Sequence, residues 1–260
     1  IHEICLHGHI NILKWIDEKS KINWKDCVGD AAKGGHLNIL EWFDSKNISF
    51  NTKSYQYAAL GNNLHIMKWL KSKNIELDSG TFYFAAEYGN IEMLEWLKEN
   101  DCPFTDNTSA GATYNGLENL KWFKENGYPL NEFTFSNAAF GGNLEILKWL
   151  KENGCPWNNE AFNLAAQNGK IENLEWLMEN ACPISAYAYS YAARKGNLEV
   201  LKWLKDNGIE FNSNATYSAS ICDNLEIIKW MKENNFPLHF RICNNLGGYG
   251  NLEVLKWIRK

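Results

Sequence analysis

The sequence has little of what marks a membrane, secreted or nucleic-acid-binding protein. No apolar run in its 260 residues approaches the roughly 18 that a membrane-spanning helix needs. The first residues show no basic stretch followed by an apolar one, as a secretory signal would. Basic residues number 26 against 31 acidic ones and form no stripe, so nucleic acid is not the expected partner. We expect a soluble, intracellular protein of the cytoplasm that binds neither membranes nor nucleic acids.

Patterns that carry catalysis or metal binding are missing as well. No nucleophile stands with a suitable base, and no glycine-rich loop has the spacing of a phosphate-binding turn. Seven cysteines occur without a C-x-x-C pair, so a zinc site is not predicted. His2, Cys5, His7 and His9 lie close in the sequence and leave a metal site open, but His9 stands in a Gly-His turn where backbone bonding is the favoured interpretation. The sequence therefore predicts no enzyme, no cofactor, no metal and no small-molecule substrate.

What the sequence has in excess is tryptophan, at 12 residues. Ten of them follow one another at intervals of 26 or 27 residues, and only Trp24 and Trp157 fall outside the series. The ten are Trp15, Trp42, Trp69, Trp96, Trp122, Trp149, Trp176, Trp203, Trp230 and Trp257. A fixed period of this length is typical of proteins built from stacked repeats.

Each of these tryptophans lies in a segment with helical periodicity, which we call helix B. Apolar residues stand five and two residues before the Trp and one residue after it, on one stripe of a helix. Asn often stands six residues before the Trp, where it would cap the helix. The helix is expected to stop five residues after the Trp, where the residues tolerate the left-handed conformation: Asn47, Asn74, Asp101, Gly127, Gly154, Gly208 and Asn235. We expect the tryptophans to form one continuous buried column.

A second apolar segment, helix A, precedes each helix B. It carries an Ala-Ala pair in most repeats, and a bulky residue stands three positions ahead of the pair: Tyr55, Phe82, Phe135, Phe162 and Tyr189. Small residues allow close packing of helices, so each repeat is expected to be a helix–turn–helix unit that stacks on its neighbours. One irregularity is predicted where Gly111 replaces an Ala of the pair, and the last helix A, with Gly247 and Gly248, is the weakest by propensity.

Three cysteines share one repeat position: Cys102, Cys155 and Cys182. Equivalent positions in neighbouring repeats should lie about 8–10 Å apart, as packed helices do. This exceeds the roughly 4.4–6.8 Å between Cα atoms that a disulfide needs. The three are therefore predicted to be buried free thiols.

The pattern resembles the ankyrin repeat. Residues Ala31 to Leu37 read A-A-x-x-G-H-L, and the stretches from Gly154 and from Gly208 correspond to the G-A-D-V-N that usually follows the second helix. The period of 27 against 33, and the missing T-P-L-H start, indicate that the β-hairpin finger is absent. This short, Trp-bearing form looks like ankyrin repeat proteins of giant DNA viruses of amoebae and of some protists. The resemblance implies an all-α, ankyrin-like helix–turn–helix solenoid without β-hairpin fingers, with about nine to ten stacked repeats, as a single array over residues 1–260 truncated within a repeat at both ends.

The resemblance also implies a non-catalytic scaffold that binds a partner protein on the exposed face of helix A, the concave side of such stacks. If the protein is viral, the partner would be a host protein. Residues twelve and eight before each Trp share this face, and the partner-binding candidates are Tyr57, Phe84, Tyr88, Tyr114, Asn137, Asn168, Tyr191 and Lys195. Aromatic residues are enriched in interface hot spots. The alternative is a structural role, in which the ends of the array stack on further repeats or other copies.

Overall fold

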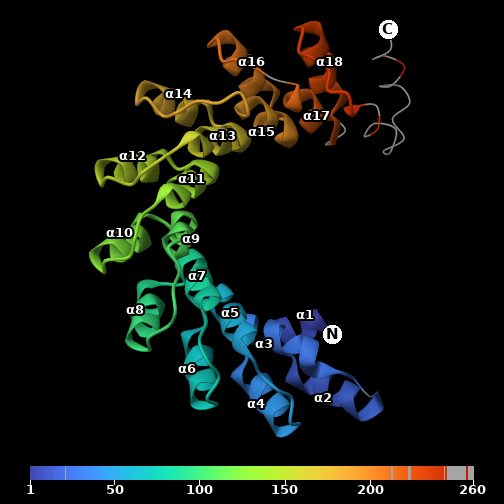
Figure 1. The fold of residues 1–260 in the computed structure, drawn as a ribbon. Helices are drawn as coiled ribbons and strands as arrows, with labels where there is room; N and C mark the ends of the chain where they lie inside the picture. Colours follow the sequence, from blue (N-terminus) through green and yellow to red (C-terminus); the bar gives the residue numbers. More distant parts are fainter. Residues whose placement is uncertain (21, 212, 222–223, 243, 245–255, 257–260) are drawn as a thin grey trace. The chain divides into compact units, whose positions relative to one another are not determined.

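The computed structural model describes residues 1–20, 22–211, 213–221, 224–242, 244 and 256. Eighteen α-helices, α1 to α18, and one short 3-10 helix, η1, are assigned in these residues, and no strand is found among them (Figure 1). The chain divides into two compact units, Ile1–Leu130 and Asn131–Lys260. Trp257, Gly247 and Gly248 lie outside the described residues. The all-helical repeat fold expected from the sequence is confirmed.

In the first unit, odd-numbered helices correspond to helix A and even-numbered helices to helix B. The A helices are α1 (His2–Leu6), α3 (Val28–Gly34), α5 (Thr52–Leu60), α7 (Ser79–Tyr88) and α9 (Thr108–Asn115). The B helices are α2 (Ile10–Lys19), α4 (Leu37–Ser45), α6 (Leu64–Ser72), α8 (Ile91–Glu99) and α10 (Leu117–Glu125). The short helix η1 (Trp24–Cys27) leads into α3.

The second unit repeats this alternation. Its A helices are α11 (Glu132–Gly141), α13 (Asn159–Asn168), α15 (Ala188–Lys195) and α17 (Asn214–Ile221). Its B helices are α12 (Leu144–Glu152), α14 (Ile171–Glu179), α16 (Leu198–Asp206) and α18 (Leu225–Glu233). In both units, each A helix and the B helix after it form a helix–turn–helix pair.

The B helices from α4 onward begin and end where the sequence predicts. Each begins at the apolar residue five positions before the Trp and ends three positions after it, as α12 does around Trp149. The residue two positions beyond each of these helices has a positive φ, for example 58° at Asn47 and 74° at Gly154. The predicted helix stops are thus confirmed. One repeat departs from the expected residue types, because Ala181 takes this position with φ 61°.

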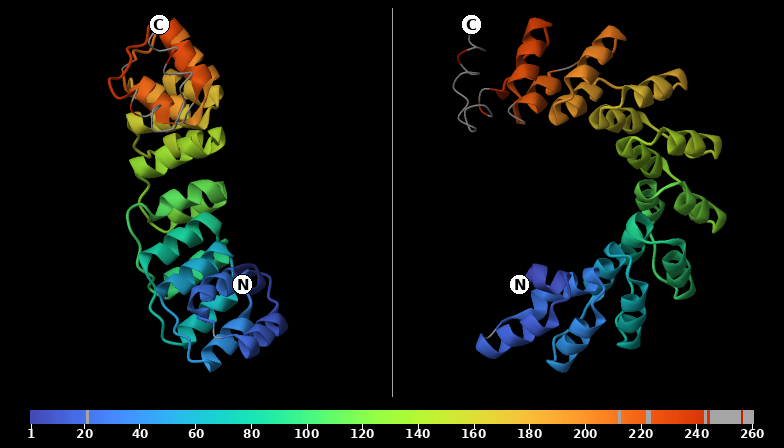
Figure 2. Two further views of the ribbon diagram at one scale, coloured as in Figure 1. Left: turned by 90° about the vertical axis from the view of Figure 1, so that its right-hand side faces the viewer. Right: turned by 180° about the vertical axis from the view of Figure 1, so that it is seen from behind.

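The A helices form the packed spine of each unit. Successive A helices pack against each other. The contacts are α1 with α3, α3 with α5, α5 with α7 and α7 with α9 in the first unit, and α11 with α13, α13 with α15 and α15 with α17 in the second. The Ala pairs at this contact are buried, and so are the predicted bulky residues from Tyr55 to Tyr189. Alanine lets two helix backbones approach closely, so a continuous core forms along the A helices. The B helices lie to one side of this row within each unit (Figures 1 and 2).

The expected buried column of tryptophans is wrong. Trp122 is the one member of the described series that is buried, Trp15 is 60% exposed, and the other seven are half-buried. The buried positions of helix B stand three and two residues before the Trp and one after it, as Ile39, Leu40 and Phe43 do in α4. At 3.6 residues per turn, the indole points about 100° away from the centre of these three positions. The tryptophans therefore lie at the edge of the buried stripe.

The residue six positions before the Trp has a second role that the sequence analysis missed. Asn143 caps its own helix as predicted, since its side chain accepts from the first amides of α12. Asn63 instead donates from Nδ2 to the Lys33 carbonyl oxygen of α3, the A helix of the previous repeat, at 2.7 Å. His36 in the same position lies with Nε2 2.9 Å from the Leu6 carbonyl oxygen, at the end of the A helix of the previous repeat. These two side chains satisfy carbonyls at the end of the A helix of the previous repeat and link one repeat to the next.

Candidate functional site

Four of the predicted binding residues lie on three neighbouring A helices of the first unit. Tyr57 is in α5, Phe84 and Tyr88 are in α7, and Tyr114 is in α9. These helices pack side by side. Tyr57, Tyr88 and Tyr114 are 42%, 44% and 43% exposed, and Phe84 is half-buried. The structure therefore brings these aromatic side chains onto one face of the row.

Tyr57 separates two hollows on this face. One, of about 240 Å³, lies between α5 and α7 and is lined by Lys53, Gln56, Tyr57, Leu60 and Phe84. The other, of about 270 Å³, lies toward η1 and α3 and includes Lys25, Gly29 and Asn51 in its lining. Gly29 allows this arrangement, because a Cβ atom there would lie 2.6 Å from the Tyr57 ring. The face is thus a series of shallow grooves divided by aromatic rings.

An aromatic cluster with one carboxylate occupies the α7–α9 part of this face. The Phe84 and Tyr88 rings stack, with centroids 6.5 Å apart, and the Tyr83 ring meets Phe84 edge-on at 6.1 Å. A hydrogen bond to Glu87 is the main cause that raises the pKa of Tyr88. The pKa of Tyr83 is raised mainly by burial and then by the charge of Glu87. The pKa of Tyr114 is raised by burial, then by Tyr83 and then by Glu87. Glu87 is therefore close to three phenols.

The sequence analysis missed Tyr83 and Glu87. They stand thirteen and nine residues before Trp96, next to the two positions that the repeat pattern singles out. Both are half-buried. Their i and i+4 spacing on a predicted helix was the available signal, because side chains four residues apart lie together on a helix surface.

The second-unit candidates offer less surface. Asn137 in α11 is buried, with 9% of its surface exposed, so it does not have the exposed position expected of a binding residue. Its short side chain does not extend past the neighbouring helices, whereas Tyr57 at the same repeat position does. Asn168 is half-buried and donates from Nδ2 to the Phe140 carbonyl oxygen at 2.8 Å. Lys195 is exposed at the end of α15.

Tyr191, the remaining candidate, is half-buried in α15. Its hydroxyl donates to Glu160 Oε1 of α13 at 2.7 Å. Burial, and then this hydrogen bond, raises the pKa of Tyr191 to about 12. The residue therefore joins two repeats and presents only part of its ring to a partner.

Tryptophans of the series line grooves between successive B helices. One groove contains Trp122 with Lys98 and Asn126, and an equivalent groove contains Trp176 with Lys151 and Asn180. In each, the lysine Nζ donates to the asparagine Oδ1 of the next repeat at 2.6 Å. The lysines thus bridge neighbouring repeats across the indoles, which favours a structural role for this face.

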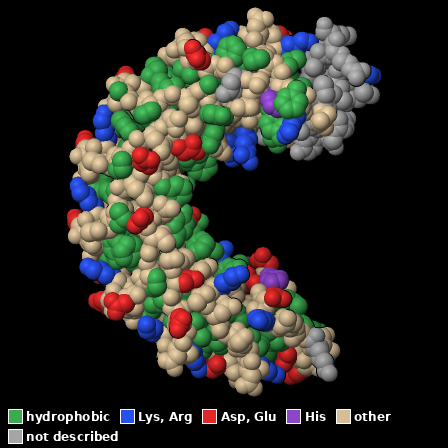
Figure 3. All heavy atoms as spheres, in the orientation of Figure 1, with side chains coloured by type: hydrophobic (Ala, Val, Ile, Leu, Met, Phe, Trp, Pro, Cys, Tyr) green, Lys and Arg blue, Asp and Glu red, His purple; other side chains and the backbone are tan. Residues whose placement is uncertain are grey.

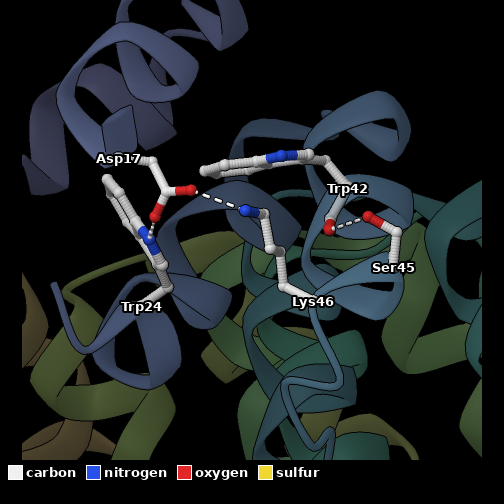
Figure 4. A network of polar contacts seen from close by, with 5 residues as sticks. All are labelled: Asp17, Trp24, Trp42, Ser45 and Lys46. Atoms are coloured by element: carbon white, nitrogen blue, oxygen red, sulfur yellow. Dashed lines mark hydrogen bonds and ion pairs between the residues drawn. The ribbon is translucent and has the colours of Figure 1, made fainter. Parts of the chain in front are cut away.

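In the first repeats the same bridge uses a carboxylate. Lys46 donates from Nζ to Asp17 Oδ2 at 2.7 Å, and Asp17 Oδ1 accepts from Trp24 Nε1 at 2.8 Å (Figure 4). The Lys46 ammonium also lies 5.9 Å from the centroid of the Trp42 ring. The hydrogen bond from Lys46, and then that from Trp24, lowers the pKa of Asp17. Asp17 therefore ties together α2, η1 and α4.

Groups with potential for chemistry are dispersed or buried. Among the described residues, no set of three His, Cys, Asp or Glu side chains is placed to hold a metal ion. His2 Nδ1 lies 2.6 Å from Asp30, and His7 Nε2 lies 3.2 Å from Glu3. The repeated cysteines, Cys102, Cys155 and Cys182, are buried and free, as predicted. Burial raises their pKa values to about 12, 12 and 11, so their thiols are poor nucleophiles.

The described helices and one side of the surface bear on the expectations about membranes and nucleic acids. No helix in the described part of the chain is long and apolar enough to cross a bilayer. On the side drawn in Figure 3, acidic and basic side chains are interspersed, with apolar side chains among them. A basic stripe, the electrostatic mark of nucleic-acid binding, is not seen on that side.

Comparisons with solved structures find helical-repeat proteins. One is the pentatricopeptide repeat protein PPR10 in complex with an 18-nt psaJ RNA element, at 12% identity and a TM-score of 0.44, with 99% of this chain and 47% of that chain covered. Another is the pentatricopeptide repeat protein PPR10 from maize, at 14% identity and a TM-score of 0.40, with 91% and 43% covered. The chain thus spans about half the length of these structures.

A comparison with curated proteins gives no match. A family model described as ankyrin repeats (3 copies) matches the chain twice, over residues 135–215 and 162–242. Both matches lie in the second unit, where α11 to α18 form four helix–turn–helix pairs. The family to which this part of the chain is similar is therefore the ankyrin repeat family.

Proposed function

We propose that the protein is a non-catalytic scaffold that binds a partner protein on the A-helix face of its first unit. The observation that carries this proposal is the exposure of Tyr57, Tyr88 and Tyr114, together with Phe84, on three adjacent helices. These rings leave a large apolar surface in water beside a buried Ala spine. Such rings provide binding energy when a partner removes them from water. The ankyrin repeats found in residues 135–242 support an interaction role in general.

The short Trp-bearing repeat supports a more specific version of the proposal. Its likeness to ankyrin repeat proteins of giant DNA viruses leads us to propose a viral protein that acts in the host cytoplasm. The partner would then be a host protein. Each unit provides a row of packed A helices, and the residues proposed to contact the partner vary from repeat to repeat on one face.

The test is variant-dependent capture of a partner. The chain carrying Phe84→Ala and Tyr88→Ala is compared with the natural chain and with a control that lacks two exposed aromatics of the second unit, Phe133→Ala and Tyr187→Ala. We expect the first variant to capture at least tenfold less cross-linked partner, because it lacks a hot-spot pair. The control variant should capture as much partner as the natural chain does. Quantitative mass spectrometry measures the captured partner.

Two outcomes would contradict the proposal. Equal capture by all three chains would remove the binding role from this face. A large fall in the thermal midpoint of the Phe84 and Tyr88 variant would assign these rings to the core instead. Light scattering on the same samples tests the alternative role, since stacking of copies predicts a mass that rises with concentration.

A further inference from the structure

The α7–α9 cluster places one negative charge among aromatic rings. Tyr83 and Glu87, and likewise Phe84 and Tyr88, stand four residues apart and therefore share the exposed side of α7. Tyr114 reaches the same place from α9, which packs against α7, and it is among the causes that raise the pKa of Tyr88, as Tyr83 is for Tyr114. The ring faces carry partial negative charge and add to the field of the carboxylate.

Gly111 makes this juxtaposition possible. A Cβ atom at this position would lie 2.8 Å from the Tyr83 carbonyl oxygen and 3.2 Å from Ala86 Cβ, so the alanine found here in most repeats would push α9 away from α7. With glycine, the backbone of α9 approaches α7 closely. Tyr114, one helical turn after Gly111, is thereby brought toward Tyr83 and Glu87. The irregular repeat noted in the sequence thus has a structural consequence at the surface.

The charge of Glu87 has no basic counterpart on these helices. Neither α7 nor α9 contains a lysine, arginine or histidine. The one basic residue of the adjacent helix α5 is Lys53. It lines the hollow between α5 and α7, on the other side of Phe84. A cation from outside is therefore favoured on the α9 side of the cluster and disfavoured on the α5 side.

We propose that Glu87, with the rings of Phe84, Tyr88 and Tyr114, binds an arginine side chain from a basic segment of the partner protein. The planar guanidinium can stack on a ring face while it donates two hydrogen bonds to a carboxylate. Lysine provides a point charge without the planar surface, so arginine is the better match to a site with both features. This inference rests on the proposed function, because it names the chemistry of a partner bound at the same face.

The test is a titration with a defined probe. The probe is a fluorescein-labelled peptide of glycine and serine with three arginines, and its matched control carries citrulline, which has the same shape without the charge. Fluorescence anisotropy with the full chain measures binding. We expect the arginine peptide to bind, the citrulline peptide to bind roughly tenfold more weakly, and Glu87→Gln to weaken the arginine peptide by a similar factor. Tyr88→Leu should weaken it roughly threefold through loss of the ring.

A matched acidic control separates this site from general attraction to an acidic protein. Glu118 is exposed on α10 of the same unit, so Glu118→Gln changes the net charge equally and should leave binding unchanged. Tyr88→Phe keeps the ring and removes the hydroxyl whose interaction with Glu87 raises the pKa of Tyr88, so it should bind at least as well as the natural chain. Equal binding by Glu87→Gln and the natural chain, or an equal loss with Glu118→Gln, would overturn the inference.

The same variants distinguish this inference from the proposed function. If the captured partner is lost with Phe84→Ala and Tyr88→Ala but is insensitive to Glu87→Gln, the interaction face stands and the arginine site is wrong. If the partner is kept by the double alanine variant, the proposed function fails. The peptide titration then decides the arginine site by itself.

Discussion

At the scale of single residues, the tryptophans show how one repeated side chain can take different roles. The period places them equivalently, yet Trp15 is largely exposed and Trp122 is buried. Trp24, outside the series, is buried and donates to Asp17. The surroundings of each indole decide its burial, because neighbouring aromatic residues cover some of them. Trp122, for example, stacks on Tyr128 at 5.7 Å between centroids.

Asp17 provides a prediction at this scale that depends on pH. Its pKa is lowered in the folded protein, chiefly by Lys46 and then by Trp24. A carboxyl with a folded pKa below its unfolded value contributes stability above the unfolded pKa, and this contribution is lost as the pH falls through the folded pKa. We expect Asp17→Asn to lower stability near neutral pH by about 1 kcal/mol or less, since the pair is partly exposed.

Denaturation of both chains in urea, followed by tryptophan fluorescence across the acidic range, measures this effect. The difference between the natural chain and Asp17→Asn should narrow as the pH falls, because protonated Asp17 also lacks the charge that holds Lys46. A difference that stays constant with pH would show that the carboxylate charge is not what stabilises this contact.

At the scale of the helix, the stop of each B helix is set by one residue in the left-handed conformation. Glycine adopts it freely, whereas a Cβ atom makes it costly. Ala181 has φ 61° where the repeats before and after it carry Gly154 and Gly208. We expect Ala181→Gly to raise stability by about 1 kcal/mol, because it removes backbone strain.

The reverse substitution at an equivalent stop is the matched control. Gly154 has φ 74°, and a Cβ atom there would have no neighbour within 4 Å. Gly154→Ala should therefore lower stability by about 1–2 kcal/mol through backbone strain alone. Thermal denaturation of both variants gives the comparison, and a loss of stability with Ala181→Gly would contradict this explanation of the helix stop.

At the scale of the whole molecule, each unit depends on close contact along its A helices. Ala85 is fully buried in α7, which packs against both α5 and α9. A larger side chain would force these helices apart, and overpacking of this kind costs about 1–3 kcal/mol. We expect Ala85→Leu to lower the urea midpoint, while Lys71→Leu on the exposed side of α6 changes it little. Equal midpoints for the two variants would place the main stacking contact elsewhere.

Much of the candidate site could be predicted from position within the repeat, and part of it could not. The offset from each Trp identified Tyr57, Phe84, Tyr88 and Tyr114 as members of one helix face, because helical geometry depends on local spacing alone. The same offset selected Asn137, which is buried, since the rule contains no information on side-chain length relative to the neighbouring helices. Tyr114 meets Tyr83 and Glu87 only because α9 approaches α7 closely at Gly111, which the offset does not contain.

The sequence by itself determined the pairing of helices A and B and the limits of the B helices, because capping residues, left-handed stops and apolar periodicity act within a few residues. Only the tertiary structure decided which stripe of helix B is buried. The sequence predicted a column of tryptophans, but the close packing of the Ala pairs puts the core along the A helices and leaves the indoles at its edge. Burial depends on which helices approach most closely, and that is a property of neighbouring repeats together.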